Sequence, residues 1–300
     1  MENLPADYWV TSLQFTPHTY QDVYPSIEPS NPKLSLAGKV AILTGASRGL
    51  GSKAFGPAFV KAGVKAVVLV ATNADKLRTV EANLKSINPD LETLVVAANI
   101  ADTASVASLF EQVKARFGHA DILINNAGVI SGPGLIADAD PDQWWVNFEI
   151  NTKGAFLLVQ GFLKLLPSSD TPAFVLNLTT SGAWKVLPEV TGYTISKLAA
   201  QKLMTDLAAT YPNVTSVAMH PGLLETDMLL DAFRKFNLDT PELVGGTAVW
   251  LASEEAKFLS GKTIAANWSV DDLVARKEEI VKDGLLNIDL KGKFGKEQFE

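Results

Sequence analysis

The feature that most constrains this chain is an alternation, beginning near Lys39, between short apolar runs and longer amphipathic segments. The runs are rich in valine and isoleucine, and they have the length of β-strands. Strands that are apolar throughout are typical of a parallel sheet whose two faces are both covered by helices. We therefore expect an α/β protein, a single domain with a doubly wound (Rossmann) parallel sheet of about seven strands. The predicted strands are KVAILTG, KAVVLVAT, ETLVVAANI, ADILINNAG, PAFVLNLTT, NVTSVAMHPG and KTIAANW.

The chain is expected to carry an extension at each end of this domain. Its 300 residues, 47% of them apolar, suffice to bury the core of one large α/β domain. Residues 1–35 are rich in proline and show no period, which predicts an arm that lies on or beside the domain. Residues 36–268 are the predicted Rossmann domain. Residues 269–300 are a predicted C-terminal helical extension, because VDDLVARKEEIVKDG has an amphipathic helical pattern.

Composition and charge exclude several classes of partner. The net charge of −7 argues against a surface for nucleic acid or for an anionic membrane. The chain has no cysteine, and its three histidines are far apart, so neither a disulfide nor a metal site is expected. We find no signal-peptide pattern and no apolar stretch long enough to insert in a membrane. We expect a cytoplasmic protein whose partner is a small-molecule substrate.

The stretch TGASRGLG, residues 44–51, follows the first predicted strand and opens a helical pattern. Gly45 would allow a sharp turn, Gly49 a close approach of the backbone to a pyrophosphate, and Gly51 the packing of the helix on the strand. The unpaired N–H groups and the positive dipole end of the helix would attract the phosphates. The alternative interpretation is a tight strand-to-helix turn that binds nothing.

Four motifs follow one another on the elements just predicted. They are TGASRGLG with Gly45, Gly49 and Gly51, NNAG at 125–128, YTISK with Tyr193 and Lys197, and HPG with Pro221 and Gly222. Together they resemble the TGxxxGxG, NNAG, YxxxK and PG signatures of the short-chain dehydrogenases/reductases, over roughly residues 36–268. The tail ANWSVDDLVARKEEIV is loosely similar to extensions of fungal members. The resemblance implies an oxidoreductase that acts on CH–OH and C=O groups with a nicotinamide cofactor.

The end of the second predicted strand bears on the choice of cofactor. In dinucleotide folds an acidic residue there binds the adenosine ribose and marks NAD. Here Ala71, Thr72 and Asn73 occupy that corner, so no carboxylate would repel a 2′-phosphate. Arg48 could pair with this phosphate, as arginines at the matching position do in NADP-using relatives; a solvated loop arginine is the alternative. We predict that NADP(H) is favoured over NAD(H).

The resemblance also implies the remaining cofactor contacts. Asn99 stands where the family often has an aspartate beside the adenine ring. Residues 126–128 would lie along the adenosine ribose, and residues 221–224 with Thr226 would hold the nicotinamide carboxamide. Strand-ending asparagines and a simple Pro-Gly turn are the alternatives. The full predicted cofactor set is Gly45, Ser47, Arg48, Gly49, Leu50, Thr72, Asn73, Asn99, Ile100, Asn126, Ala127, Gly128, Tyr193, Lys197, Pro221, Gly222, Leu224 and Thr226.

Tyr193 and Lys197 are one helical turn apart, so they share a helix face. A tyrosine pKa near 10 must fall by about three units, or about 4 kcal/mol, for acid–base work at neutral pH. An ammonium group about 4 Å away supplies about that much at an effective dielectric constant near 20. We therefore predict that Tyr193 is the acid–base residue and Lys197 its electrostatic partner. By resemblance, Lys197 also bonds the nicotinamide ribose. Without the other motifs, an ordinary helix with an amphipathic tyrosine would be the better interpretation.

Two further catalytic positions are predicted by resemblance. The family's substrate-orienting serine corresponds to Thr180, and Ser181 is the rival. Consecutive strand residues point to opposite sides, so the two hydroxyls are not interchangeable unless the strand has already ended. Threonine offers the same hydrogen-bonding hydroxyl as serine with one extra methyl group. Asn151 corresponds to the family's fourth active-site residue, at a helix kink. Asn147 is its competitor, and a structural asparagine bonded to the backbone is the alternative for Asn151.

The substrate pocket is expected from SGPGL, from residues 184–190 and from LLDAFRKFNLDTPELV. Its apolar residues predict a lipophilic ketone or alcohol as substrate. They are Val186, Leu187, Leu229, Leu230 and Phe233. Arg234 and Lys235 could meet an acidic group of the substrate, but a solvated helix face is the favoured interpretation. Two other functions stay open, namely non-redox chemistry such as isomerisation, dehydration or cyclisation, and a cofactor-binding regulator without turnover. By resemblance the protein is a homodimer or homotetramer. The sequence identifies neither the substrate nor the direction of the reaction.

Overall fold

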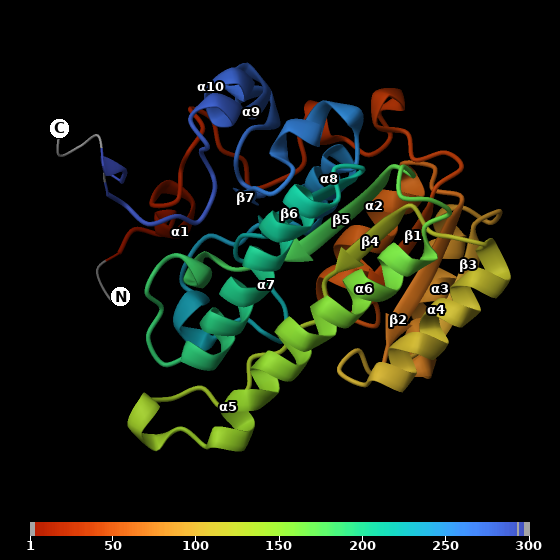
Figure 1. The fold of residues 1–300 in the computed structure, drawn as a ribbon, viewed down its shortest axis with the longest axis horizontal. Helices are drawn as coiled ribbons and strands as arrows, with labels where there is room; N and C mark the ends of the chain where they lie inside the picture. The colour runs from red at the N-terminus through yellow and green to blue at the C-terminus, as the bar shows by residue number, and fades with distance from the viewer. Residues whose placement is uncertain (1–3, 293, 297–300) are drawn as a thin grey trace.

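The computed structural model describes residues 4–292 and 294–296. Within them, seven parallel strands form one sheet in the order β3-β2-β1-β4-β5-β6-β7 (Figure 1). The order reverses between β1 and β4, and a ligand crevice is expected outside the carboxyl ends of strands at such a point. The predicted doubly wound fold is therefore confirmed. The strands are β1 Val40–Thr44, β2 Ala66–Ala71, β3 Glu92–Ala97, β4 Ile122–Asn125, β5 Ala173–Leu178, β6 Val214–His220 and β7 Thr263–Ala265.

Helices cover both faces of the sheet (Figure 1). α2, α3 and α8 pack together on one face, whereas α4, α6 and α7 pack on the other. This arrangement follows from right-handed crossovers in both directions from β1 and β4. The helices are α1 Tyr8–Thr11, α2 Gly56–Lys61, α3 Ala74–Ile87, α4 Thr103–Phe117, α5 Pro141–Phe148, α6 Ala155–Leu165, α7 Thr191–Thr210, α8 Pro241–Leu251, α9 Val270–Ala275 and α10 Lys277–Lys282.

The central strands of the sheet contribute to two hydrophobic cores, because their side chains alternate between the faces. In β1, Ala41 and Leu43 belong to the core under α2, α3 and α8, whereas Val40 and Ile42 belong to the core under α4 and α6. Every residue of β1 is buried. A strand buried on both sides has no polar face, which explains the uninterrupted apolar runs of the sequence.

Two helices contain a π-helical turn close to the carboxyl edge of the sheet. One covers Gly51–Phe55 and leads into α2, and the other covers Glu149–Gly154 and joins α5 to α6. Such turns insert an extra residue in a helix and are frequent at functional sites. Asn151 lies in the second turn, at the place where the sequence predicted a helix kink.

The two ends of the described chain pack against each other (Figure 1). Thr19 and Trp268 form an isolated antiparallel bridge, and Tyr20 and Asn267 are joined by a backbone hydrogen bond of 2.8 Å. The segment predicted as one C-terminal helix forms two, α9 and α10. Arg276 separates them, and its guanidinium group donates to the Phe15 carbonyl at 2.6 Å and lies 3.8 Å from the centre of the Phe15 ring.

No helix among the described residues is both long and apolar enough to span a membrane.

Candidate active site

The glycine turn after β1 is packed tightly against the end of β4. Gly45 and Gly49 have φ angles of +64° and +54°, which only glycine adopts without strain. A Cβ atom on Gly45 would lie 2.8 Å from the Asn126 side chain and 2.9 Å from the Ala127 backbone. A Cβ atom on Gly51 would clash with the Gly45 carbonyl. Gly51 therefore packs against the glycine turn itself, whereas the sequence predicted that it packs on the strand. At Gly49 the nearest atom would be 3.9 Å away, and this glycine faces open space.

Thr44, the last residue of β1, ties this turn to the NNAG motif. Its buried hydroxyl donates to the Ile124 carbonyl at 3.0 Å and accepts from the N–H groups of Asn126 and Ala127 at 3.1 and 3.2 Å. The Asn126 side chain donates in return to the Thr44 carbonyl at 2.8 Å. The two motifs therefore form one rigid floor at the topological switch point.

A cavity of about 470 Å³, within the usual range for small-molecule sites, lies over this floor. We call it the glycine-loop cavity. Of the predicted cofactor residues, it is lined by Gly45, Ser47, Arg48, Gly49, Leu50, Thr72, Asn73, Asn99, Ile100, Asn126, Ala127, Gly128 and Thr226. A second cavity, the Tyr193 cavity, is lined by the others, namely Tyr193, Lys197, Pro221, Gly222 and Leu224. Leu50, Asn126, Gly128, Thr226 and Met228 line both, so the two cavities adjoin.

The corner of the glycine-loop cavity next to β2 is cationic and has no acidic residue from that strand. Arg48 pairs with Asp227 at 2.9 Å; both residues line the cavity, and both side chains are exposed. Lys76 also lines this corner and was missed in the sequence analysis. The Asn73 side chain caps α3 by accepting a hydrogen bond from the Lys76 backbone N–H at 2.9 Å. An asparagine cap places the residue three positions later in the first turn of the helix, and this pattern could have indicated Lys76.

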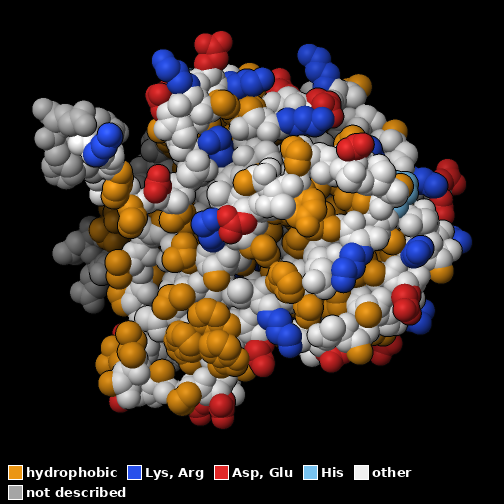
Figure 2. Space-filling view, viewed as in Figure 1, with side chains coloured by type: hydrophobic (Ala, Val, Ile, Leu, Met, Phe, Trp, Pro, Cys, Tyr) orange, Lys and Arg blue, Asp and Glu red, His pale blue; other side chains and the backbone are white. Residues whose placement is uncertain are grey.

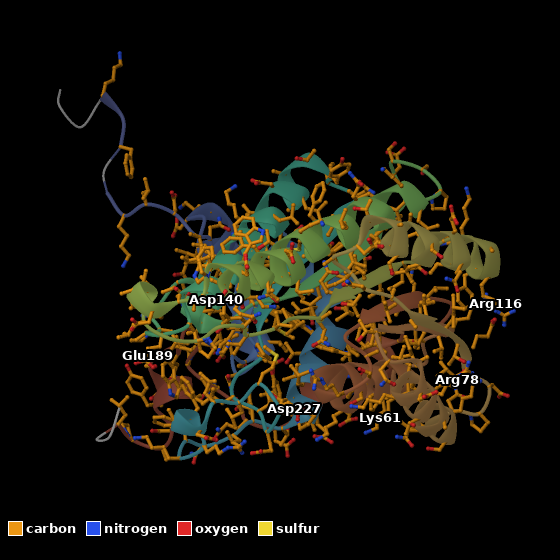
Figure 3. The ribbon with its side chains drawn as sticks, turned by 90° about the horizontal axis from the view of Figure 1, so that it is seen from below. Lys61, Arg78, Arg116, Asp140, Glu189 and Asp227 are labelled. Atoms are coloured by element: carbon orange, nitrogen blue, oxygen red, sulfur yellow. The ribbon has the colours of Figure 1, made fainter. Side chains whose placement is uncertain are left out.

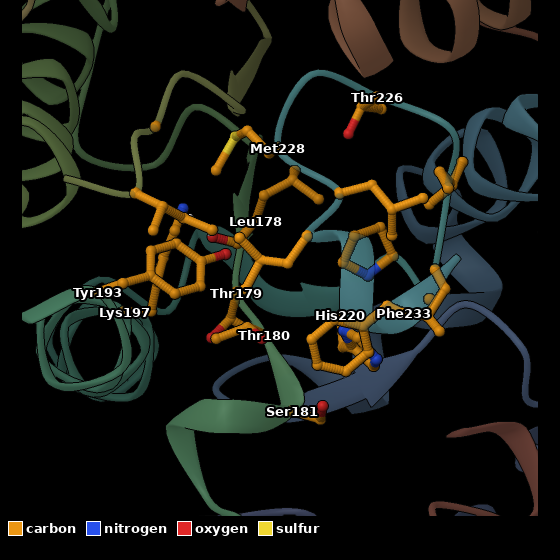
Figure 4. A pocket seen from close by; sticks show the side chains of 18 of the residues that line it. Leu178, Thr179, Thr180, Ser181, Tyr193, Lys197, His220, Thr226, Met228 and Phe233 are labelled. Carbon is orange, nitrogen blue, oxygen red and sulfur yellow. Dashed lines mark hydrogen bonds between the residues drawn. The ribbon is translucent and has the colours of Figure 1, made fainter. Parts of the chain in front are cut away.

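The Tyr193 cavity brings together three of the predicted catalytic side chains (Figure 4). Tyr193 and Lys197 come from α7, and the Tyr193 hydroxyl makes a hydrogen bond with the side chain of Thr180. Lys197 donates from Nζ to the Leu178 carbonyl at 2.8 Å. Its Nζ lies 6.0 Å from the centre of the Tyr193 ring.

Burial, and not the neighbouring charge, dominates the pKa values of this pair. Burial raises the pKa of Tyr193 to about 12, although the hydrogen bond from Thr180 acts in the opposite direction. Burial lowers the pKa of Lys197 to about 8. Both changes favour the neutral forms, because the charged forms lose hydration. The expected lowering of the tyrosine pKa by Lys197 is therefore not present in this structure.

A short 3₁₀ turn, Ser181–Ala183, begins at Ser181, and Thr180 directly precedes it. β5 has already ended at Leu178, so strand alternation does not decide between the two hydroxyls. Thr180 contacts Tyr193, whereas Ser181 lies further from Tyr193 on the cavity wall (Figure 4).

Asn151 and Asn147 are both buried, but they contact different parts of the chain. Asn151 accepts from the Val129 N–H at 2.9 Å and donates to the Val129 carbonyl and to the Ser196 hydroxyl, both at 3.0 Å. A Cβ atom on Gly128 would lie 3.1 Å from both the Asn151 amide oxygen and Lys197 Nζ. Asn151 is therefore close to Lys197, whereas Asn147 accepts from the Ser131 N–H and donates to the Ser131 carbonyl.

The Pro-Gly turn after β6 is held by one buried carboxylate. Asp239 accepts from the Leu223 N–H at 2.8 Å and from the Asn267 side chain at 2.7 Å. Gly222 has a φ of +88°, and a Cβ atom there would clash with Asp239. Burial raises the pKa of Asp239 to about 6, against the effect of its hydrogen bonds. The turn is thus fixed to the segment that follows β7.

The wall of the Tyr193 cavity differs in part from the predicted pocket. Leu187, Leu229, Leu230 and Phe233 line it as expected, but the side chain of Val186 is 93% exposed and lies outside. Ile130 lines the cavity in place of the SGPGL segment that follows it. Arg234 is exposed and pairs with Glu225 and Asp231, as expected for a solvated face.

Trp9 and His220 also line this cavity, and both were missed in the sequence analysis. His220 directly precedes the Pro-Gly turn at the end of β6, which was a usable signal. Trp9 lies in the N-terminal arm and gave no local signal. His220 is buried, and burial lowers its pKa to about 4, so the imidazole is neutral at neutral pH.

The sheet order and the glycine turn are those of a dinucleotide-binding α/β protein. Residues 39–236 match the family model described as short chain dehydrogenase. The chain therefore belongs to the short-chain dehydrogenase/reductase family, which implies a nicotinamide cofactor and oxidoreductase activity.

Two fungal relatives and one solved structure illustrate the similarity. The short chain dehydrogenase tazN of Aspergillus terreus is 35% identical over 285 residues, which cover 92% of this chain and 60% of that protein. The short chain dehydrogenase citE of Monascus ruber is 33% identical over 280 residues, which cover 91% and 94%. A gluconate 5-dehydrogenase from Burkholderia cenocepacia J2315, solved in complex with NADP and tartrate, superposes with a TM-score of 0.70 at 24% identity, over 78% of this chain and 95% of that one. The expected similarity to fungal members is confirmed.

The buried His220 predicts a specific loss of stability in acid. An unfolded histidine titrates near pH 6.5, whereas the folded His220 titrates near pH 4. Between these values the unfolded chain binds a proton that the folded protein does not, so stability falls as the pH falls, by about 3 kcal/mol in total. The His220→Asn variant lacks this contribution. Urea unfolding of both proteins between about pH 7 and pH 4 measures the difference, in which the other titrations cancel. A difference in unfolding free energy that is independent of pH would contradict the prediction.

Proposed function

We propose that this protein transfers a hydride between NADP(H) and a carbonyl or alcohol group of a small, apolar substrate. The observation that carries the proposal is that the cavity lined by Tyr193, Lys197 and Thr180 adjoins the glycine-loop cavity, with which it shares five lining residues. One cavity has a glycine turn and a cationic corner, and the other is mostly apolar. A dinucleotide and an apolar substrate would thus reach the same proton donor.

The residues of the glycine-loop cavity fit a nicotinamide dinucleotide. Gly49 leaves open space over the turn, where a backbone N–H can approach a phosphate. Asn99 and residues 126–128 would lie along the adenosine, and residues 221–224 with Thr226 would hold the nicotinamide end. When bound, the nicotinamide supplies the hydride to a ketone or accepts one from an alcohol.

In the proposed mechanism of reduction, Tyr193 gives its hydroxyl proton to the substrate oxygen, which becomes an alcohol. Tyr193 is protonated at neutral pH because burial raises its pKa to about 12, so the proton is available. Thr180 donates a hydrogen bond to the same substrate oxygen and orients it. Burial lowers the pKa of Lys197 to about 8, so its ammonium group is mainly protonated at neutral pH. Its role as electrostatic partner of the tyrosinate stays a proposal, because in this structure Lys197 bonds the Leu178 carbonyl and does not lower the pKa of Tyr193. Asn151 fixes the backbone beside Lys197.

The preference for NADP(H) rests on Arg48 and Lys76, together with the missing carboxylate at the end of β2. Thr72 and Asn73 stand in that corner, and neither repels a phosphate. The Asp227 carboxylate balances part of the Arg48 charge, which leaves Lys76 as a second cation for the 2′-phosphate. The gluconate 5-dehydrogenase of similar fold was solved with NADP.

Removing the Arg48 charge should weaken NADPH binding selectively. We expect Arg48→Ala to raise the Kd for NADPH about tenfold and to leave the Kd for NADH within about twofold, since only NADPH carries the 2′-phosphate. Binding is measured by fluorescence titration. The control is Arg116→Ala, because Arg116 is also exposed and ion-paired, with Glu92, yet lies far from Asp227 (Figure 3). A wild-type protein that binds NADH more tightly than NADPH would overturn the preference.

Ketone reduction should consume NADPH in a one-to-one ratio with the alcohol formed. α-Tetralone, an apolar bicyclic ketone, is the first probe, and the absorbance of reduced nicotinamide gives the rate.

We expect Tyr193→Phe to lower kcat by about 10²-fold or more and to keep cofactor binding, because the variant lacks only the proton donor. Tyr211→Phe, next to the end of the same helix and exposed, is the control.

Two results would contradict this function. Conversion of a substrate without loss of NADPH would indicate the non-redox alternative. A Tyr193→Phe protein with wild-type turnover would exclude Tyr193 as the proton donor.

The two neighbouring hydroxyls should differ in their effect on turnover. We expect Thr180→Ala to lower kcat by about 10²-fold, the usual effect of losing one oriented donor, whereas Thr180→Ser keeps most activity. Ser181→Ala should stay within about threefold of wild type, because the hydrogen bond with Tyr193 comes from Thr180. Steady-state kinetics of the three variants test this assignment. If Ser181→Ala is the variant that loses turnover, the assignment of Thr180 is wrong.

We further propose a cytoplasmic homodimer or homotetramer. An apolar patch of Trp145, Phe148, Phe156 and Leu203 lies over α5, α6 and α7 (Figure 2). The side chains of Trp145 and Phe156 are 55% and 46% exposed, which is unusual for large apolar residues on a free surface. These helices flank the turn of Asn151 and carry Tyr193.

We also propose that the chain divides into an N-terminal arm of residues 1–35, a Rossmann domain of residues 36–268 and a C-terminal extension of residues 269–300.

A further inference from the structure

Asp239, near the end of the loop between β6 and α8, is a buried carboxylate to which the proposed mechanism gives no role. The residue is 6% exposed. Each carboxylate oxygen has its own donor, because Oδ2 accepts from the Leu223 N–H at 2.8 Å and Oδ1 accepts from Nδ2 of Asn267 at 2.7 Å. The Asp239 N–H donates in turn to the Leu223 carbonyl at 2.6 Å. Two hydrogen bonds therefore join Asp239 to the residue that follows Gly222.

The carboxylate also fills the space beside the Pro-Gly turn. A Cβ atom on Gly222 would clash with Oδ2 of Asp239 and would lie 3.0 Å from Oδ1 of Asn267. With a φ of +88°, Gly222 has a backbone conformation that glycine adopts without strain. The turn thus packs directly on the carboxylate, in addition to the hydrogen bonds that it makes with it.

Asn267 is itself held in place, so the carboxylate has a fixed support. Nδ2 of Asn267 also donates to the Tyr20 carbonyl at 2.9 Å, and the Asn267 carbonyl accepts from the Tyr20 N–H at 2.8 Å. Ala266 donates from its N–H to the His220 carbonyl at 2.9 Å. The segment after β7 therefore carries Asn267 along the end of β6, where the Pro-Gly turn begins.

Asp239 closes the base of a long loop. Its bonds with Leu223 join the start and the end of the segment between β6 and α8. Between these ends the loop carries Thr226, which lines both cavities, and Phe233, which lines the Tyr193 cavity (Figure 4). The position of Asp239 therefore bears on the wall of the cavity, although Asp239 does not line it.

The charge of this carboxylate does not stabilise the fold. Burial raises the pKa of Asp239 from 3.8 to about 6, although the bonds from Leu223 and Asn267 act in the opposite direction. As the pH rises between these values, the unfolded chain loses its proton first, so stability falls and stays lower at neutral pH. A neutral amide would avoid this cost but would offer one acceptor oxygen in place of two. The second acceptor is what the turn and Asn267 require.

We propose that Asp239 is a positioning residue that holds the Pro-Gly turn where the nicotinamide half of NADP(H) binds. The proposal rests on the function proposed above and adds a residue that lines neither cavity. Asp239 acts through Leu223 and Gly222 and takes no part in proton transfer. It therefore sets the affinity for the nicotinamide half, whereas the adenosine half, in the glycine-loop cavity, does not depend on it.

Two ligands separate the halves of the site. NADPH occupies both, whereas adenosine 2′,5′-bisphosphate carries the adenosine and the 2′-phosphate but no nicotinamide. Their Kd values are measured by titration calorimetry for the wild type, Asp239→Asn, Asp239→Ala and Asp231→Asn. The asparagine keeps the shape of the side chain with one acceptor oxygen, and the alanine has none. Asp231→Asn is the matched control, because Asp231 lies on the same loop and its side chain is 97% exposed.

We expect the Kd for NADPH to rise about fivefold in Asp239→Asn and about tenfold or more in Asp239→Ala, as for the loss of one and of two hydrogen bonds. The Kd for the bisphosphate should stay within about twofold in both variants, and Asp231→Asn should match the wild type. The midpoint of urea unfolding at about pH 8 should not be lower in Asp239→Asn than in the wild type, because the amide buries no charge.

Three results would overturn the proposal. They are an unchanged Kd for NADPH in Asp239→Asn and Asp239→Ala, an equal loss of affinity for both ligands, and a lower unfolding midpoint in Asp239→Asn, which would indicate a purely structural role. If Asp239→Ala does not fold, the isosteric Asp239→Asn decides.

These measurements separate the inference from the function on which it rests. A selective loss of NADPH affinity in a protein that reduces no ketone supports the role of Asp239 and contradicts the redox function. Reduction of α-tetralone by NADPH, with unchanged Kd values in the variants, supports the function and contradicts the role of Asp239. A wild type that binds neither ligand contradicts both.

Discussion

The whole site depends on how β1 and β4 meet, and one buried hydroxyl fixes that meeting. Thr44 bonds the carbonyl of Ile124 and the N–H groups of Asn126 and Ala127, while Asn126 bonds back to Thr44. The strand order reverses between these two strands, so the chain leaves them toward opposite faces and a crevice opens above. The glycine turn can lie flat on this floor only because Gly45 has no side chain. In the proposed function, the dinucleotide and the substrate reach one proton donor above this floor.

The second constraint is the low dielectric environment around Tyr193 and Lys197. Burial acts against charge on both residues, and it exceeds the effect that two residues one helical turn apart have on each other. In the proposed reduction this is useful, because the neutral tyrosine holds the proton that the substrate oxygen needs. The reverse reaction starts from a tyrosinate, which the same surroundings disfavour. Because the reduction leaves a tyrosinate and the oxidation starts from one, the cost of this charged form applies to both directions of the proposed reaction.

The sequence predicted the features that have a local cause. Strands buried on both faces leave uninterrupted apolar runs, and a turn with positive φ requires glycine at Gly45 and Gly49. The contribution of Trp9 could not be predicted, because it depends on packing against Phe233, more than two hundred positions further along the chain. The pKa values of the acid–base pair depend on burial, which spacing along a helix does not show. Val186 is apolar, yet its exposure is decided by the path of its loop. The catalytic and cofactor roles assigned by resemblance stay predictions.

The contacts between the two ends of the chain have a consequence for the order in which the protein is made. The arm is held against the Tyr193 cavity by Trp268 and Arg276, which leave the ribosome more than two hundred and fifty residues after it. Domains generally fold from the N-terminus during synthesis. The glycine turn and its strands can therefore assemble on the nascent chain, whereas the wall that contains Trp9 is completed only after Trp268 and Arg276 have left the ribosome.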